Sequence, residues 1–316
     1  MILKSAKNRE ACIHPYVFTK NARTAWLKIL NMIGEVNSNS LSLLLPSYIG
    51  INDKEGSGVF DAVQASDSKA DFYKLTDDLQ VDLEDFEFRL KNKRYDIVLV
   101  IHYFGVSRVD MSKIKDLCNK YSTILVEDCA HAFYFGNSGE SLGDYGDFSF
   151  YSLHKYLASS GGGMLKINNN SFRKPMVDEN ETISNCDLEC FASSDFRKIA
   201  DLRKRNYISY QAKLKSNENF EVMFSYNEND IPQTFPLRIK NGLREKLYFY
   251  LYEHGVPTVA LYYRLIPQIE KNSYHNSYLI SSEILNLPVH QDTTSVDIEY
   301  ICNKISQFFN ENKSEM

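Results

Sequence analysis

The sequence predicts an α/β fold with a mostly parallel sheet, crossover helices and a second, smaller α+β domain. Residues 95–105, YDIVLVIHYFG, form an apolar run that ends at a glycine, as is typical of a strand buried on both faces. TILVEDCA at 123–130 is the next such run, and the amphipathic segment SKIKDLCNKY at 112–121 lies between them. Strand–helix–strand alternation of this kind indicates parallel strands joined by crossover helices.

Length and composition fit a soluble globular protein. A chain of 316 residues can bury a large core and form two domains, which we place at 1–205 (large) and 206–316 (small). The formal net charge of −5 argues against broad binding to nucleic acid or to anionic membranes.

The start of the chain lacks a signal-peptide pattern and no transmembrane run follows, so we expect a cytoplasmic protein. The six cysteines contain no CxxC pair, so neither a disulfide framework nor a metal site is expected.

The first half of the chain alternates helical and strand patterns. Asn21 is available to cap a helix over 20–33, and Pro46 ends a short apolar strand within 41–48. The pattern then predicts two further strands and a turn followed by a helix, at 58–63, 70–75 and 77–90.

The second half changes character after residue 167. Residues 168–194 are polar and lack periodicity, which predicts a loop, and 194–215 predicts a long charged helix. The small domain is then expected to contain strand 234–239, helix 242–255, strand 256–263, a loop with LNLPVHQD at 285–292, and a terminal helix from Ser295.

Residues with chemical potential follow the predicted strands. In parallel sheets the carboxyl ends of the strands line the ligand crevice, and His102, Asp128 and the segment Pro46–Tyr48 occupy such ends. Between Val126 and Ile167 the chain presents an acid, a histidine, two serines, a lysine and a glycine triplet, in that order: Asp128, His131, Ser149, Ser152, Lys155 and 161–163.

That order suits pyridoxal phosphate. The cofactor needs a lysine that can form an imine, an acid that keeps its pyridine nitrogen protonated, and donors for its phosphate. Asp128 is a buried carboxylate in want of a cation, which a pyridinium would supply. Lys155 lies between an apolar strand and glycines that permit close approach of the backbone to a bound group. Taken singly, each residue also fits a plain role: a turn aspartate, a surface lysine, strand-end hydroxyls or a structural histidine.

The stretch resembles the DegT–StrS family of pyridoxal-phosphate sugar aminotransferases, within the fold type I group. The family's EDxA(H/Q) pattern appears at 127–131, and its FSF…K…GG pattern appears as Phe148–Phe150, Lys155 and 162–163. Further segments match the family in the same order, namely NARTAW at 21–26, LLLPSY at 43–48, VIHYFG at 100–105 and LNLPVHQDTT at 285–294.

The resemblance implies a seven-stranded, mostly parallel sheet sandwiched by helices, with a small C-terminal α+β domain. It implies that Lys155 forms the imine and shuttles a proton, that Asp128 holds the pyridinium, and that His131 lies close to the ring. The other residues it assigns to the cofactor site are Ala22, Arg23 and Thr24 with the amides around them, Ser149 or Ser152, and Tyr48.

It also implies the reaction and its partners. An amino acid, usually glutamate, donates the amino group, and a nucleotide-linked keto sugar for surface glycan or lipopolysaccharide synthesis accepts it. The cofactor site of fold type I enzymes usually lies between subunits, so the resemblance implies a homodimer.

The chain departs from the family pattern in several places. The phosphate-site glycine is Ala22, and the aromatic residue that usually stacks on the ring falls at Gly50, so that Tyr48 or Tyr103 would have to replace it. The family's GYNYRM-like loop is missing, and only Asn206-Tyr207 resembles it.

The lysine position itself has two alternatives. Counted forward from Phe148 it falls on His154, and counted backward from 162–163 it falls on Lys155. Relatives with histidine there are sugar 3-dehydratases, so the alternative functions are a dehydratase that uses His154, or a non-catalytic relative that serves as a binding subunit. We favour Lys155 and an aminotransferase.

Overall fold

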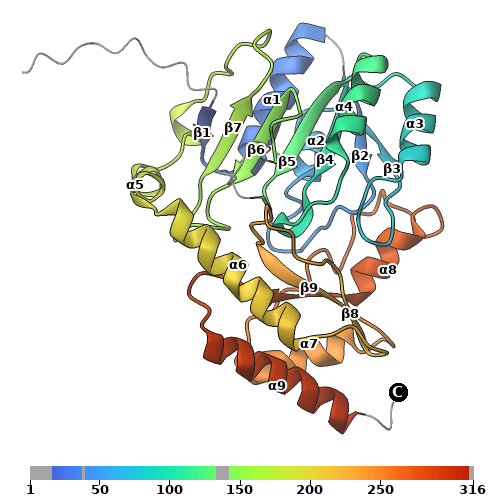
Figure 1. Ribbon diagram of the computed structural model, residues 1–316. Coiled ribbons are helices and arrows are strands. Elements are labelled where there is room, and N and C mark those ends of the chain that lie inside the picture. Colours follow the sequence, from blue (N-terminus) through green and yellow to red (C-terminus); the bar gives the residue numbers. More distant parts are fainter. Residues whose placement is uncertain (1–15, 38–39, 133–141, 313–316) are drawn as a thin grey trace, which may run out of the picture.

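A computed structural model describes residues 16–37, 40–132 and 142–312 of the chain. Within these residues seven strands form one sheet in the order β1-β7-β6-β5-β4-β2-β3 (Figure 1), as predicted. Their bounds are β1 (Tyr16–Thr19), β2 (Ser42–Pro46), β3 (Lys69–Tyr73), β4 (Ile97–Ile101), β5 (Ile124–Cys129), β6 (Phe148–Ser152) and β7 (Gly163–Ile167).

The central strands of this sheet are parallel. β2 pairs in parallel with β3 and β4, β4 with β5, and β5 with β6, whereas β7 is antiparallel to both β6 and β1. Every residue of β4 and β6 is buried, and β4 accordingly reads as an unbroken apolar run, as expected of a parallel strand covered on both faces. Asp128 pairs with Ile101 on one side and Phe150 on the other.

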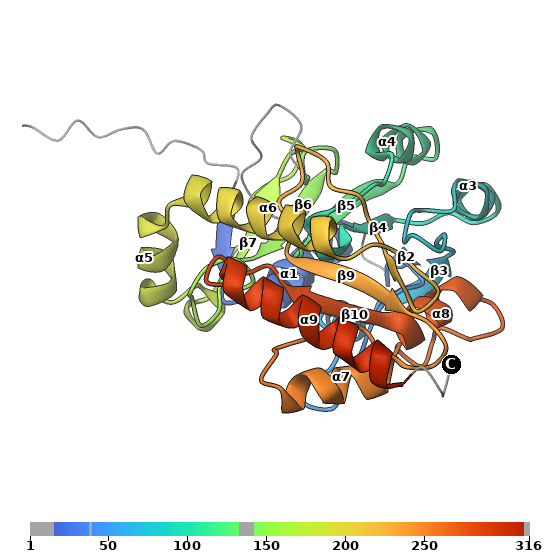
Figure 2. The same cartoon turned by 60° about the horizontal axis from the view of Figure 1, so that its bottom comes forward.

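Helices cover both faces of the large sheet, as Figures 1 and 2 show. The helix α1 (Ala22–Asn37) packs on β6, β7 and the short α2 (Phe60–Ala65). On the other face α4 packs on β5, and α3 packs beside β3. The bounds of these two helices are Met111–Lys120 for α4 and Leu83–Asn92 for α3. A turn of 3₁₀ helix, η1 (Tyr103–Gly105), follows β4.

The described C-terminal part contains a smaller, three-stranded antiparallel sheet in the order β10-β9-β8. Its strands are β8 (Phe220–Val222), β9 (Thr234–Ile239) and β10 (Ile284–Pro288), and its helices are α7 (Arg244–Glu253), α8 (His275–Glu283) and α9 (Ser295–Glu311). The helix α6 (Phe196–Lys213) runs from the large sheet to the small one and contacts α9 (Figure 2). The domain boundary predicted at 205/206 falls inside this helix. The division into two domains stays a prediction.

Several element predictions were wrong. Residues 60–65 form α2 instead of a strand, because a helix of six residues is too short to show a helical period. Residues 256–263 are irregular, with one isolated bridge from Val259 to Asn286, and 284–288, expected in a loop, form β10. The predicted loop 168–194 contains η2 (Glu179–Glu181) and α5 (Asn185–Ser193). The pattern did not reveal α5 because this helix lacks an apolar stripe and begins at the capping residue Ser184.

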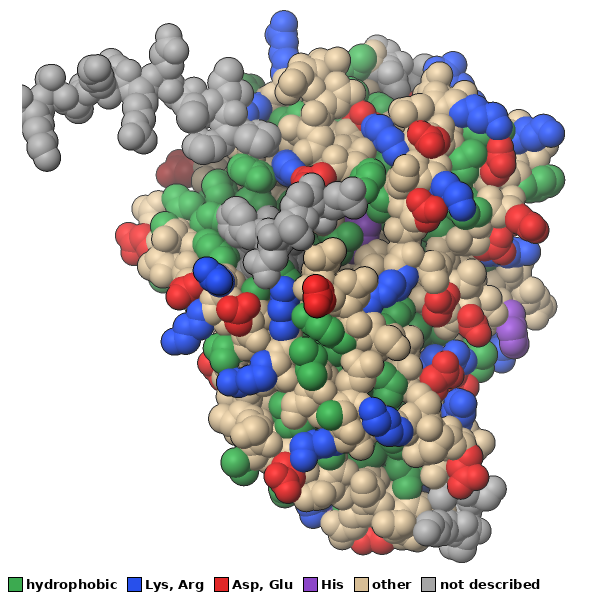
Figure 3. All heavy atoms as spheres, viewed as in Figure 1, with side chains coloured by type: hydrophobic (Ala, Val, Ile, Leu, Met, Phe, Trp, Pro, Cys, Tyr) green, Lys and Arg blue, Asp and Glu red, His purple; other side chains and the backbone are tan. Residues whose placement is uncertain are grey.

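The surface agrees with the low net charge. On the face shown in Figure 3, basic and acidic side chains are interspersed over both halves of the molecule. Among the described helices there is none with the length and apolar character needed to cross a membrane.

One glycine is required where β7 passes the start of α1. A Cβ atom at Gly163 would overlap the Asn21 carbonyl group and lie 2.6 Å from the Ala22 nitrogen. Both neighbours are backbone atoms, so neither can move aside cheaply. The loop before α1 and the strand β7 are therefore held at a separation that no other residue type permits.

We predict that Gly163→Ala lowers the free energy of unfolding by about 2 kcal/mol or more, because the added methyl group overlaps backbone. Gly58→Ala is the matched control, since a Cβ atom there meets nothing within 4 Å. Urea denaturation of both variants measures the difference. Equal midpoints for the two variants would contradict the packing described here.

Candidate active site

The carboxyl ends of β2, β4, β5 and β6 meet at the edge of the large sheet that faces the small sheet (Figure 1). Asp128 lies at the end of β5, His131 follows it by three residues, and Lys155 lies in the turn after β6. The N-terminus of α1 lies next to the glycine triplet that follows the lysine turn, since the Gly162 amide donates to the carbonyl of Lys20 just before the helix. The sheet thus gathers residues that are far apart in the sequence.

Asp128 is a buried acid with few partners. Only 3% of the residue is exposed, and the Ala130 amide donates a hydrogen bond to its Oδ1 at 2.8 Å. Burial raises the pKa of Asp128 to about 6, although this amide and the charges of Lys155 and His102 oppose the rise. A carboxylate whose charge is so poorly compensated favours a cationic group beside it.

His131 is buried and neutral. Its ring stacks on Phe104, with 6.3 Å between centroids and 13° between planes. Burial and then the charge of Lys155 lower its pKa well below the usual range. Its Nδ1 is buried without a hydrogen-bond partner among the described residues. Since buried polar atoms are nearly always paired, this nitrogen is available to a group that binds here.

Lys155 is partly buried and electrostatically coupled to both residues. Burial lowers the pKa of its amine to about 8, although the carboxylates of Asp128 and Glu55 oppose the effect. The neighbouring His154 is exposed, and its Nδ1 lies 3.2 Å from Ser152 Oγ. Of the two alternatives for the lysine position, the structure thus brings Lys155, rather than His154, into the electrostatic group with Asp128 and His131.

The start of α1 offers free amides. Asn21 caps the helix as predicted, since its Oδ1 accepts from the Thr24 amide at 2.9 Å and from the Thr24 hydroxyl at 3.0 Å. The first amides of the helix, at Ala22 and Arg23, have no intrahelical partners and suit a phosphate. The Arg23 side chain points elsewhere, to Asp61 at 3.1 Å and to the Glu55 carbonyl at 2.6 Å.

The two serines of β6 lie on opposite faces of the sheet, because side chains alternate along a strand. Ser152 shares the face of Phe150, whose ring stacks on Trp26 of α1 with 5.7 Å between centroids. Ser149 shares the face of Tyr151, and their oxygens are 3.5 Å apart. Ser152 is therefore on the side of the α1 amides, and the structure does not bring Ser149 to them.

Tyr48 has a role in joining the two halves. It is fully buried, and its hydroxyl donates to the Leu261 carbonyl at 2.8 Å, while its own carbonyl accepts from the Tyr103 hydroxyl at 2.7 Å. Its ring lies edge-on to Tyr103 and Tyr262, 5.4 and 5.3 Å away. Tyr48 and Tyr103, the two tyrosines that the sequence offered for stacking on the cofactor ring, are thus both held in this cluster by their hydroxyl groups.

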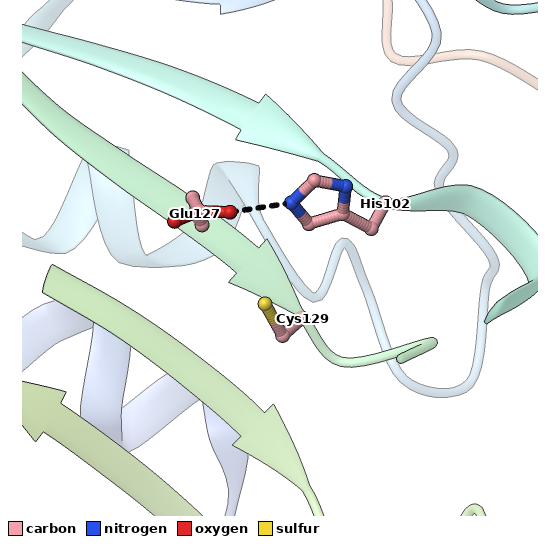
Figure 4. Close-up of side chains that lie close together, drawn as sticks. All are labelled: His102, Glu127 and Cys129. Carbon is pink, nitrogen blue, oxygen red and sulfur yellow. Dashed lines mark hydrogen bonds and ion pairs between the residues drawn. The ribbon is translucent and has the colours of Figure 1, made fainter. Parts of the chain in front are cut away.

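Sequence reasoning missed the role of Glu127, the residue before Asp128. Its buried carboxylate accepts from His102 Nε2 at 2.8 Å (Figure 4). It also accepts from the amides of Gly143, Tyr145 and Gly146, at 3.0, 2.8 and 2.5 Å. A glutamate within the apolar run ILVEDC was the signal that could have indicated it.

Cys129 lies next to this pair, and the side-chain ligand atoms of His102, Glu127 and Cys129 are within 4.8 Å of one another (Figure 4). Both nitrogens of His102 are already hydrogen-bonded, since Nδ1 lies 2.8 Å from Ser107 Oγ. Both oxygens of Glu127 are used as well, and burial raises the pKa of the Cys129 thiol. The His102 and Glu127 atoms of this cluster are therefore already engaged in hydrogen bonds within the protein.

A second residue that sequence reasoning missed is Arg203 of α6, which is buried. Its guanidinium donates to the Lys155 carbonyl at 3.0 Å, to the Gln233 carbonyl at 3.1 Å and to Gln291 Oε1 at 3.0 Å. The guanidinium carbon also lies 4.5 Å from the centroid of the Tyr156 ring. The arginine thereby joins the lysine turn to the C-terminal part.

Asn206 and Tyr207 also lie inside α6 and are buried. The amide of Asn206 donates to the carbonyls of His290 and Thr293, and the Tyr207 hydroxyl donates to the Phe224 carbonyl. They hold the helix against the C-terminal part of the chain, so they do not form a remnant of a substrate loop.

The residues present fit pyridoxal phosphate. Among the described residues no side chain donates a hydrogen bond to the Asp128 carboxylate and none pairs with His131 Nδ1, while Lys155 has an amine with a lowered pKa and α1 offers amides for a phosphate. Together with the parallel sheet they form the arrangement expected of a fold type I transferase.

The sequence comparison supplies the family. The model of the DegT/DnrJ/EryC1/StrS aminotransferase family matches residues 58–186 and 193–306, so the chain belongs to this family, as predicted. Among curated relatives, GDP-perosamine synthase of Escherichia coli O157:H7 is 24% identical over 266 residues, covering 73% of this chain and 70% of that enzyme. GDP-perosamine synthase of Vibrio cholerae is 35% identical over 92 residues, which cover 28% of this chain and only 24% of that enzyme.

Solved structures share the fold at low identity. An aminotransferase, TlmJ, from Streptoalloteichus hindustanus superposes with a TM-score of 0.78 at 20% identity, covering 95% of this chain and 87% of that chain. The Helicobacter pylori aminotransferase PseC, involved in the biosynthesis of pseudoaminic acid, gives 0.77 at 15% identity, with 94% and 87% covered. These neighbours confirm the predicted fold class.

We predict that Glu127→Gln lowers the free energy of unfolding by roughly 2 kcal/mol or more. The new amide group would face N–H donors that now point at a carboxylate, and would leave one of them unpaired. Chemical denaturation measures the loss, and the exposed Glu189→Gln is the control. A stability equal to that of the control would mean that the four hydrogen bonds contribute little.

Proposed function

We propose that the protein is a pyridoxal-phosphate-dependent aminotransferase that moves an amino group from an amino acid to a nucleotide-linked keto sugar. One observation carries the proposal: the ends of β5 and β6 bring together a buried acid, a partly buried lysine and a buried imidazole whose Nδ1 has no partner among the described residues, and burial lowers the pKa of the lysine. Perturbed groups gathered at one place in this way are characteristic of catalytic sites.

Each residue has a distinct task in this proposal. Asp128 would hold the protonated pyridine nitrogen through a charge-assisted hydrogen bond, and the α1 amides with Ser152 would bind the phosphate. When bound, the cofactor supplies an electron sink for the bond that breaks at the amino carbon. Lys155 Nζ, neutral in a useful fraction of molecules near neutral pH, would take and return the proton at that carbon. His131 would keep its Nδ1 towards the ring.

The substrate class rests on the relatives. Their names include GDP-perosamine synthase and dTDP-4-amino-4,6-dideoxy-D-glucose transaminase, which supports a nucleotide-linked sugar as acceptor. A role in surface glycan or lipopolysaccharide synthesis rests on the family resemblance. Glutamate as donor and a homodimer are parts of the proposal that rest on the family resemblance alone.

A dehydratase is the alternative function, because His154 directly precedes Lys155. A solved GDP-4-keto-6-deoxymannose-3-dehydratase shares the fold with a TM-score of 0.73 at 14% identity, so the fold does not separate the two reactions. The aminotransferase is favoured because His154 is exposed and its ring contacts Ser152, whereas Lys155 is the residue that interacts with Asp128 and His131.

We predict that Lys155→Ala abolishes covalent cofactor binding and lowers transamination roughly 10²–10⁴-fold, because it removes the group that transfers the proton. Borohydride reduction and peptide mapping should label Lys155 in the wild-type protein, and the visible absorbance band should fall when glutamate is added. His154→Ala is the matched control and should keep both properties. Loss of activity in His154→Ala with retention in Lys155→Ala would establish the dehydratase, and a colourless protein under excess cofactor would contradict both functions.

A second prediction concerns pH. Only the neutral amine reacts, so the rate of covalent capture at saturating cofactor should rise as the pH passes about 8. The Asp128 charge raises the pKa of Lys155, so Asp128→Asn should move the midpoint to lower pH. Stopped-flow absorbance measures both profiles. A wild-type midpoint near 10.4, the ordinary value for lysine, would show that burial does not act on this amine.

A further inference from the structure

The chain between β2 and α2 is paired with a segment of the C-terminal part. Ile51 donates its amide to the Arg264 carbonyl, and Ile266 donates to the Ile49 carbonyl, both at 3.0 Å. Gly50 lies between them, in an isolated antiparallel bridge to Leu265. This short ladder fixes residues 262–266 against the strand end that carries Tyr48.

Tyr262, just before this ladder, has an unusual backbone. Its φ is 58°, in the left-handed region that side-chain-bearing residues rarely adopt. Ser281 Oγ donates to its carbonyl at 2.6 Å and helps to hold the conformation. Strained residues of this kind persist where the surrounding structure fixes them, often beside functional sites.

The Tyr262 ring fills the space above Gly50. A Cβ atom at position 50 would lie 2.6 Å from Cγ and 2.8 Å from Cβ of Tyr262. Residue 50 must therefore be glycine as long as the tyrosine occupies this place. An aromatic side chain at position 50 and the ring of Tyr262 exclude each other.

The same ring reaches the candidate active site. Its centroid lies 6.1 Å from that of His131 and 5.3 Å from that of Tyr48. Burial and then the negative charge of Asp128 raise the pKa of the Tyr262 hydroxyl. Tyr262 is therefore a neutral, half-buried aromatic group within reach of the acid and the imidazole.

We propose that Tyr262, held from the C-terminal part of the chain by the ladder at Gly50, packs on the cofactor ring and supplies the aromatic contact that position 50 cannot. This inference rests on the proposed function. A flat aromatic side chain beside Asp128 and His131 suits the face of a heteroaromatic ring, and the backbone strain is consistent with a position set by this contact.

The test measures the dissociation constant of pyridoxal phosphate by equilibrium dialysis. Tyr262→Leu should weaken binding about fivefold to tenfold, the effect of one lost aromatic contact, and Tyr262→Phe should restore it because the hydroxyl is not required. Tyr263→Leu is the matched control, since that neighbouring tyrosine is 50% exposed. An unchanged dissociation constant in Tyr262→Leu would overturn the proposal.

A swap of positions separates a direct contact from a structural role. Tyr262→Gly accepts the positive φ without strain and leaves room at position 50, so Tyr262→Gly with Gly50→Phe should bind the cofactor more tightly than Tyr262→Gly alone. A double variant no better than Tyr262→Gly would overturn the direct contact. If the wild-type protein does not bind the cofactor at all, the proposed function itself fails, which distinguishes the two results.

Discussion

The site depends on how the carboxylate of Glu127 is satisfied inside the large sheet. Neighbouring residues of a strand face opposite sides, so Glu127 and Asp128 receive different surroundings from consecutive positions of β5. Glu127 collects one imidazole and three backbone amides, and thereby fixes the end of β4 and residues 143–146 to β5. Asp128 on the other side receives a single amide from the part of the chain that the structure describes. Glu127 holds the strand ends together, whereas the charge of Asp128 is left with little compensation on the opposite face of the sheet.

The poorly compensated carboxylate of Asp128 lowers the stability of the folded protein when no ligand is bound. Because its folded pKa is raised to about 6, the carboxyl is tolerated when protonated, and folding stability falls as the pH rises through that value. The unpaired Nδ1 of His131 adds a further cost. A group that supplies both missing partners would return this free energy as binding affinity and would stabilise the folded chain.

The sequence predicted those parts of the site that lie at the ends of regular strands. β4, β5 and β6 are apolar enough to be recognised, so the positions of Asp128 and Lys155 relative to the sheet followed from their order. Tyr262 did not follow, because it lies in an irregular segment that chain order does not place beside Gly50. The partners of Glu127 are backbone amides, which carry no sequence information. The helices α2 and α5 were missed because the first is very short and the second begins with a cap in a polar segment.

The contacts of Arg203 have a mechanical consequence. Its guanidinium binds the main chain beside Lys155 as well as residues of the C-terminal part at 233 and 291. The main chain of the lysine turn, which follows β6 of the large sheet, is thus fixed through Arg203 to residues that lie next to β9 and β10 of the small sheet. A rotation of the small sheet against the large one would be transmitted through this planar group as a displacement of the turn.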